Sequence, residues 1–149
     1  MNILLVEDDE FKEERIVNFI CEKITSANVD ISRSVYSAIQ FTKSQIYDFV
    51  ILDMALPGHD ISVGSGPASS LPAGGLHVAL ELDFAGRKDK IVVVTQYPDI
   101  EVDGELIETL SAVEKLQDSI SPHIVSTVYY DNKRDDWQKS LLTTLSENK

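Results

Sequence analysis

Short apolar runs alternate along the chain with longer segments in which apolar residues recur every three or four positions. The short runs are rich in Val and Ile and lie at 2–7, 28–35, 47–53, 90–96 and 123–130. Runs of this length and composition are typical of buried strands, whereas a period near 3.6 is typical of amphipathic helices. The pattern therefore predicts five strands that alternate with helices.

The segments of helical period define five expected helices. They lie at 10–24, just after Val35, and at 76–84, 103–120 and 135–146. Apolar residues align on one face of each longer helix: Ile16, Val17, Ile20 and Ile24; Leu76, Leu80 and Phe84; Leu106, Leu110, Val113 and Ile120; Trp137, Leu141, Leu142 and Leu145. We expect these faces to cover the sheet.

Strand and helix alternation at this length indicates an α/β fold in a single domain spanning 1–149. Right-handed crossovers would give a doubly wound parallel sheet of five strands in a three-layer sandwich, with the weaker second strand at or near an edge. In such sheets, ligands bind at the carboxyl ends of the strands. A functional site is therefore expected at that edge.

One segment interrupts the alternation. Residues 57–75 contain five of the seven glycines and three of the five prolines, which excludes a regular helix or a central strand. We expect a long loop directly after the third strand. Long loops in compact domains are usually functional or mobile.

The charge and the single cysteine exclude several classes of protein. A net charge of -12 argues against direct nucleic-acid binding, which needs clustered Lys and Arg. Cys21 alone cannot form an intramolecular disulfide. No secretory leader opens the sequence, and no apolar run is long enough to cross a bilayer. We expect a cytoplasmic protein that does not bind membranes.

Acidic and hydroxyl residues stand where the strands end. Glu7 and Asp8 close the first strand, Asp53 the third and Thr95 the fourth. Three carboxylates in one cleft repel each other and favour a cation, and oxygen ligands suit Mg²⁺. Asp53 is the candidate nucleophile for phosphoryl transfer, with Thr95 placed to bond a phosphoryl oxygen. The next residues, Asp9 and Glu10, fit a helix start.

Three sequence pieces carry a family resemblance: "ILLVEDD", "YDFVILDMALPG" and "IVVVTQ". With them the chain resembles the receiver domain of bacterial two-component response regulators. That resemblance implies the flavodoxin-like receiver fold with strand order 2-1-3-4-5. It covers most of the chain, and the acidic pair together with the Asp-x-x-x-Pro-Gly run at 53–58 is fairly specific.

The resemblance also implies roles for the residues. Asp53 would accept a phosphoryl group from a sensor histidine kinase or a phosphotransfer protein. Asp8, Asp53 and the main-chain carbonyl of Ala55 would bind Mg²⁺, with Glu7 acting through water, and Thr95 would move toward the phosphoryl group. Such a protein is a phosphoacceptor and not an enzyme. Since only "SENK" follows the last helix, its output is expected through contacts with a downstream protein.

One family residue is missing. Receivers usually carry a Lys, followed by Pro, at the end of the fifth strand, where it pairs with the phosphoryl group. Here Tyr129 or Tyr130 stands at that place, and a tyrosine brings no positive charge at neutral pH. Lys133, farther along, is the residue that would have to swing back.

Two alternative functions follow from these residues. A pseudo-receiver would keep the fold and act as a phosphorylation-independent binding module, as the missing Lys suggests. A Mg²⁺-dependent phosphatase with an Asp nucleophile is the other, but phosphatases of the haloacid-dehalogenase type use a second Asp two residues later. In this chain that position is Ala55.

Overall fold

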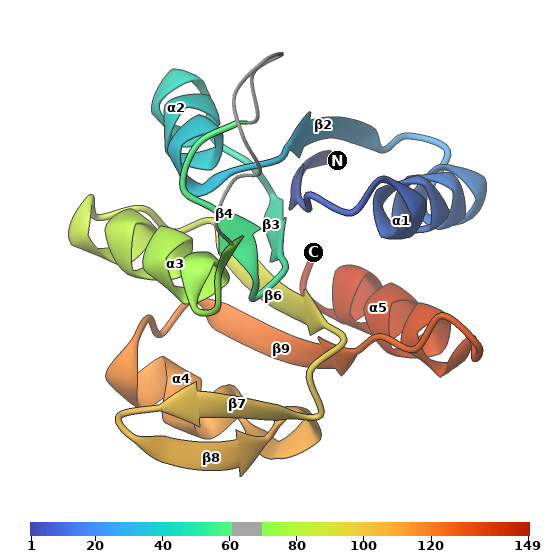
Figure 1. Cartoon of the computed structure of the whole chain (residues 1–149). Helices are drawn as coiled ribbons and strands as arrows, with labels where there is room; N and C mark the ends of the chain where they lie inside the picture. The colour runs from blue at the N-terminus through green and yellow to red at the C-terminus, as the bar shows by residue number, and fades with distance from the viewer. Residues whose placement is uncertain (61–69) are drawn as a thin grey trace, which may run out of the picture.

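The computed structural model describes residues 1–60 and 70–149 and contains a five-stranded parallel sheet (Figure 1). Its strands are β1 (Asn2–Val6), β2 (Asn28–Ser32), β3 (Phe49–Leu52), β6 (Lys90–Thr95) and β9 (Ile124–Tyr129). They are ordered β2-β1-β3-β6-β9, which is 2-1-3-4-5 when the sheet strands are counted along the chain. The predicted fold and strand order are confirmed, and the second strand is at an edge.

In the described residues, five α-helices cover the two faces of the sheet (Figure 1). They are α1 (Glu10–Lys23), α2 (Val35–Ser44), α3 (Gly74–Phe84), α4 (Val113–Ser119) and α5 (Asp136–Glu147). Helices α1 and α5 pack on one face, and α2, α3 and α4 pack on the other. The result is the three-layer sandwich that the alternation of strands and helices predicts.

The sheet separates two apolar clusters because successive strand residues point to opposite faces. Along β1, Ile3 and Leu5 pack with residues of α1 and α5, whereas Leu4 and Val6 pack with residues of α2 and α3. Burial on both faces explains why β1, β3 and β6 read as unbroken apolar runs.

The expected helix at 103–120 is wrong over its first half and is confirmed only at its end, in α4. Its first part belongs to a hairpin of β7 (Asp99–Val102) and β8 (Glu105–Glu108), followed by the 3-10 turn η1 (Thr109–Ser111) and the short α4. The hairpin turns at Asp103 and Gly104, whose φ angles are 52° and 79°. An Asp-Gly pair with positive φ angles favours a two-residue β-turn and is incompatible with the start of a helix at this place.

The expected apolar face of α3 is also wrong in part. Leu76 is buried, but Leu80 and Phe84 are exposed, and the helix instead buries Ala79 and Leu82. The helix is apolar around most of its circumference, so residue spacing alone does not identify the buried side.

The two ends of the segment 57–75 contain regular secondary structure. Two short strands, β4 (Leu56–Pro57) and β5 (Ser70–Leu71), pair antiparallel and close its base, and α3 begins at Gly74. The central part of the expected loop, 61–69, lies outside the described residues. In the described part of the chain, no helix combines the length and apolar character needed to cross a membrane.

Candidate functional site

The strand ends form a pocket of about 260 Å³ at the carboxyl edge of the sheet. Its lining residues are Glu7, Asp8, Asp9, Asp53, Ala55, Ser70, Thr95, Gln96 and Tyr97. The five residues proposed from the sequence for the metal, the acceptor and the hydroxyl contact therefore border one cavity, whereas Tyr129, Tyr130 and Lys133 are not among its lining residues.

Main-chain hydrogen bonds fix the acidic residues there. The amide of Asp53 donates to the Val6 carbonyl at 3.0 Å, and the amide of Glu7 donates to the Ser32 carbonyl at 2.9 Å. Each acid thus extends its strand by one residue before the chain turns away. Asp9 then caps α1, and its side chain accepts a hydrogen bond from the Lys12 amide, as expected of a residue at this position.

Three carboxylates come close enough to share a cation. Glu7, Asp8 and Asp53 each offer an oxygen atom, and these atoms lie within 4.8 Å of one another. A set of carboxylate oxygens with room for water is the donor set that Mg²⁺ prefers. The residues present therefore fit a magnesium ion.

Burial makes this acidic group costly without a cation. Desolvation raises the pKa of the Glu7 carboxyl to about 7; the charge of Lys12 opposes the shift, and that of Asp53 adds to it. Burial also raises the pKa of Asp8, and the charges of Asp53 and Asp9 add to that rise. Positive charge entering the pocket stabilises the ionised forms.

A buried ammonium already lies beside these acids. Lys12 Nζ is 2.6 Å from Glu7 Oε2 and 3.1 Å from Asp53 Oδ1, and it donates a hydrogen bond to the Val94 carbonyl at 2.9 Å. The Lys12 and Glu7 side chains are each 1% exposed, and that of Asp53 is 13% exposed. Three partners match the three hydrogens of an ammonium group.

Lys12 is not among the site residues predicted from the sequence, although the sequence contains a signal for it. Lys12 precedes Ile16 by four residues and Ile20 by eight, so it lies on the apolar face of α1. It also stands in the first turn of the helix, where the macrodipole disfavours a cation. A lysine in both situations indicates acidic partners in the tertiary structure.

The residues expected near the missing family Lys have different surroundings. Tyr130 is buried, its ring centroid is 5.4 Å from Lys12 Nζ, and its hydroxyl accepts a hydrogen bond from Arg15. Burial raises the pKa of this hydroxyl. Tyr129 is partly exposed, and Lys133 follows β9 in an exposed loop. In the described part of the chain, the ion pairs with Glu7 and Asp53 are made by Lys12 and not by Lys133.

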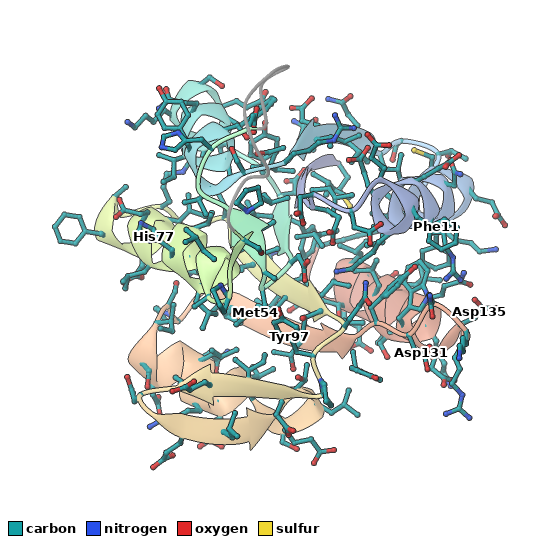
Figure 2. The ribbon with its side chains drawn as sticks, viewed as in Figure 1. Phe11, Met54, His77, Tyr97, Asp131 and Asp135 are labelled. Carbon is teal, nitrogen blue, oxygen red and sulfur yellow. The ribbon has the colours of Figure 1, made fainter. Side chains whose placement is uncertain are left out.

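Thr95 is connected to the segment that contains the unexpected hairpin. Its hydroxyl accepts a hydrogen bond from the Tyr97 amide at 3.1 Å, and the Tyr97 carbonyl accepts one from Thr109 at 2.6 Å. The Thr109 carbonyl in turn accepts a hydrogen bond from Thr127 on β9. Figure 2 shows Tyr97 where the chain passes from β6 toward the hairpin.

Close packing of α3 supports the strand end that carries Asp53. The Gly75 amide donates to the Met54 carbonyl at 2.9 Å. A Cβ atom at Gly75 would lie 2.0 Å from the Asp53 carbonyl oxygen, so no larger residue fits without a backbone shift. Gly75 therefore lets the start of α3 approach the candidate nucleophile's main chain.

Comparison with known proteins decides the family. The chain is 32% identical over 146 residues to the Detocs response regulatory protein DtcB of Vibrio alginolyticus, covering 96% of this chain and 98% of that protein. It belongs to the response-regulator family. This response regulator is also 24% identical over 142 residues to the uncharacterized protein y4jR of Sinorhizobium fredii, covering 95% and 94% of the two chains. No family model matches the chain.

Solved structures confirm that the response regulator has a receiver fold. The signal receiver domain of an HD domain-containing protein from Pseudomonas fluorescens Pf-5 has a TM-score of 0.66 at 19% identity, over 99% of this chain and 92% of that one. The receiver domain of sensor histidine kinase PA1611 from Pseudomonas aeruginosa PAO1, with magnesium in its active-site cleft, has a TM-score of 0.58 at 18% identity, over 97% of each chain.

Proposed function

We propose that this response regulator accepts a phosphoryl group on Asp53 from the phosphohistidine of a sensor histidine kinase or a phosphotransfer protein. The observation that supports this most is the meeting of Glu7, Asp8 and Asp53 with a hydroxyl, Thr95, in one pocket. The phosphorylated protein then signals through contacts with another protein.

In the transfer, one bond forms and one bond breaks. Oxygen Oδ1 of Asp53 accepts a hydrogen bond from the Met54 amide at 2.8 Å and pairs with Lys12, so we assign the attack to Oδ2. An O–P bond forms at Asp53 while the P–N bond of the phosphohistidine breaks, and its electron pair stays on the imidazole nitrogen, which then takes a proton. The product is an aspartyl phosphate.

A magnesium ion would be held by Asp8, Asp53 and the main-chain carbonyl of Ala55, with Glu7 bonding one of its water molecules. The ion would offset the charge of the phosphoryl oxygens. Thr95 would donate a hydrogen bond from its hydroxyl to one of these oxygens. Because its hydroxyl bonds Tyr97, that change would alter the hydrogen bonds that lead through Thr109 to β9.

Intact-mass measurement after incubation with acetyl phosphate and Mg²⁺ tests this function. We expect the mass of one phosphoryl group on the wild type and none on Asp53→Asn or in excess chelator. Asp48→Asn is the matched control, since Asp48 is exposed and precedes the opposite end of the same strand. Absence of label on the wild type, while a known receiver is labelled alongside, would reject the proposal.

The place of Tyr130 favours one alternative. Because β9 supplies no lysine, this alternative is a pseudo-receiver that binds its partner in one fixed state. Such a protein would bind its partner equally well as wild type and as Asp53→Asn, with or without acetyl phosphate. A change of affinity seen only under phosphorylating conditions would exclude this alternative.

A further inference from the structure

The positive charge at the site comes from helix α1 and not from the end of β9. We propose that Lys12 binds the phosphoryl group on Asp53 through its ammonium and so replaces the basic residue that β9 lacks. This inference rests on the proposed phosphorylation of Asp53.

Lys12 is already at the acceptor carboxylate. Its Nζ lies 3.1 Å from Asp53 Oδ1 and stays anchored by Glu7 and by the Val94 carbonyl. When Asp53 gains a phosphoryl group, Lys12 can exchange its contact with the carboxylate for one with a phosphoryl oxygen and keep its two other partners. A charge-assisted hydrogen bond of this kind is roughly twice as strong as a neutral one.

The charge balance requires such a group. Phosphorylation replaces the single charge of the Asp53 carboxylate with a phosphoryl group that carries more negative charge, beside Glu7 and Asp8. In the described part of the chain, Lys12 is the residue whose ion pairs bring positive charge to Glu7 and Asp53. The ammonium thus lies where negative charge accumulates, in a position that excludes water.

The surroundings of Tyr130 indicate that a lysine at this position and Lys12 are alternative sources of positive charge. Its ring packs 5.4 Å from Lys12 Nζ, and Arg15 holds its hydroxyl at 3.1 Å. A lysine at this position would bring a second ammonium next to the first. The tyrosine instead gives Lys12 an aromatic face, which favours a cation.

A purely structural role for Lys12 makes a different prediction. Removal of Lys12 should tighten Mg²⁺ binding under either role, because a competing positive charge beside Glu7 and Asp53 is gone. If Lys12 only neutralised Glu7, phosphorylation at saturating Mg²⁺ would keep its wild-type rate. If Lys12 binds the phosphoryl group, phosphorylation slows although Mg²⁺ binds more tightly.

The experiment compares Lys12→Met with the wild type in two measurements. One is the Mg²⁺ dissociation constant, by calorimetry. The other is the rate of Asp53 phosphorylation by acetyl phosphate at saturating Mg²⁺, by intact mass. We expect Mg²⁺ to bind about tenfold more tightly, from the Coulomb energy of the lost ammonium, and phosphorylation to slow about 100-fold, as for loss of one preorganised donor.

Two further variants sharpen the test. Lys23→Met removes an exposed lysine from the same helix and should change neither quantity. The double variant Lys12→Met with Tyr130→Lys moves the ammonium to the residue that follows β9 and should recover at least tenfold of the lost rate. Wild-type rates in a folded Lys12→Met would overturn the inference, whereas an unlabelled wild type would reject the proposed function itself.

A measurement on the wild type decides the matter if Lys12→Met does not fold. Protein with ¹⁵N-labelled lysine is titrated with beryllofluoride, a phosphoryl mimic, in the presence of Mg²⁺. The Lys12 Nζ resonance, identified by its loss in Lys12→Arg, should shift on adding beryllofluoride beyond its shift with Mg²⁺ alone. If beryllofluoride binds and this resonance does not move, Lys12 does not contact the phosphoryl group.

Discussion

The two ends of the sheet each contain buried charges, but positive and negative charges are equal in number at only one end. At the amino end, Asp89 accepts hydrogen bonds from Arg87 and from the Tyr47 amide, all at 2.7 Å, and Arg87 also donates to the Thr42 and Gln45 carbonyls. One carboxylate meets one guanidinium. The side chain of Asp89 is fully buried there.

At the carboxyl end, three carboxylates meet one ammonium. Lys12 leaves this group with excess negative charge, and burial raises the pKa of both Glu7 and Asp8. Buried charge alone therefore does not mark a functional site. The amino end has its full set of partners and serves stability, whereas the carboxyl end lacks positive charge that a ligand can supply.

Breaking the balanced pair should have the largest effect on folding. Asp89→Asn leaves Arg87 without its charged partner, and loss of one member of a buried pair costs about 3 kcal/mol of unfolding free energy. Urea denaturation measures this. Glu22→Gln, which breaks an exposed pair with Lys23, is the control and should change stability by less than about 0.5 kcal/mol. A loss at Asp89 no larger than the control would contradict a stabilising role.

Adding Mg²⁺ should stabilise the protein through the acidic residues at the carboxyl end of the sheet. At a hundred times its dissociation constant, the ion should raise the unfolding free energy by about 2.7 kcal/mol. Asp89→Asn should show the same increment from a lower starting value, because its substitution lies at the far end of the sheet. Asp8→Asn and Asp53→Asn should show little or none. An equal increment in all four proteins would place the ion elsewhere.

Filling the contact at Gly75 should distort the carboxyl end alone. Gly75→Ala forces a methyl group against the Asp53 carbonyl and should cost about 2 kcal/mol, the usual size of an overpacking effect. It should also weaken Mg²⁺ binding, because Asp53 shifts. Gly58→Ala is the matched control, since among the described residues its Cβ would meet Leu71 at an ordinary 3.7 Å. Unchanged Mg²⁺ affinity in Gly75→Ala would show that Asp53 is positioned without this contact.

The sequence predicts the sheet and the acidic residues because both depend on local pattern. The strand runs are apolar on both faces, and their polar ends meet through parallel topology alone. The hairpin at 99–108 was missed because the spacing of Leu106 and Leu110 imitates a helix, although Asp103 and Gly104 give the turn. In that region, turn chemistry prevailed over apolar spacing.

Lys12 was missed for a different physical reason. Its partners Glu7, Asp53 and Val94 come from three strands, and only the folded chain shows that α1 brings an ammonium to them. The family pattern directs attention to the end of β9, where Tyr130 stands. When the positive charge is on a different element than in the family pattern, no sequence motif reveals it. The remaining signal is a lysine on the apolar face of a helix.

The smallest predicted effect tests whether the carboxyl end of the sheet carries excess negative charge. Without Mg²⁺, Asp8→Asn should raise the unfolding free energy, because it removes one of the repelling charges. Solvent reaches this side chain, so the gain should stay below about 1 kcal/mol.

The pKa of Asp8 is raised in the folded protein, so the folded state holds its proton to a higher pH than the unfolded chain does. Ionisation of Asp8 therefore lowers stability as the pH rises through this range, and the gain should vanish at acid pH, where the carboxyl is neutral. Denaturation of both proteins over a pH series with chelator measures the difference. A loss of stability in Asp8→Asn at neutral pH would mean that Lys12 already balances the site.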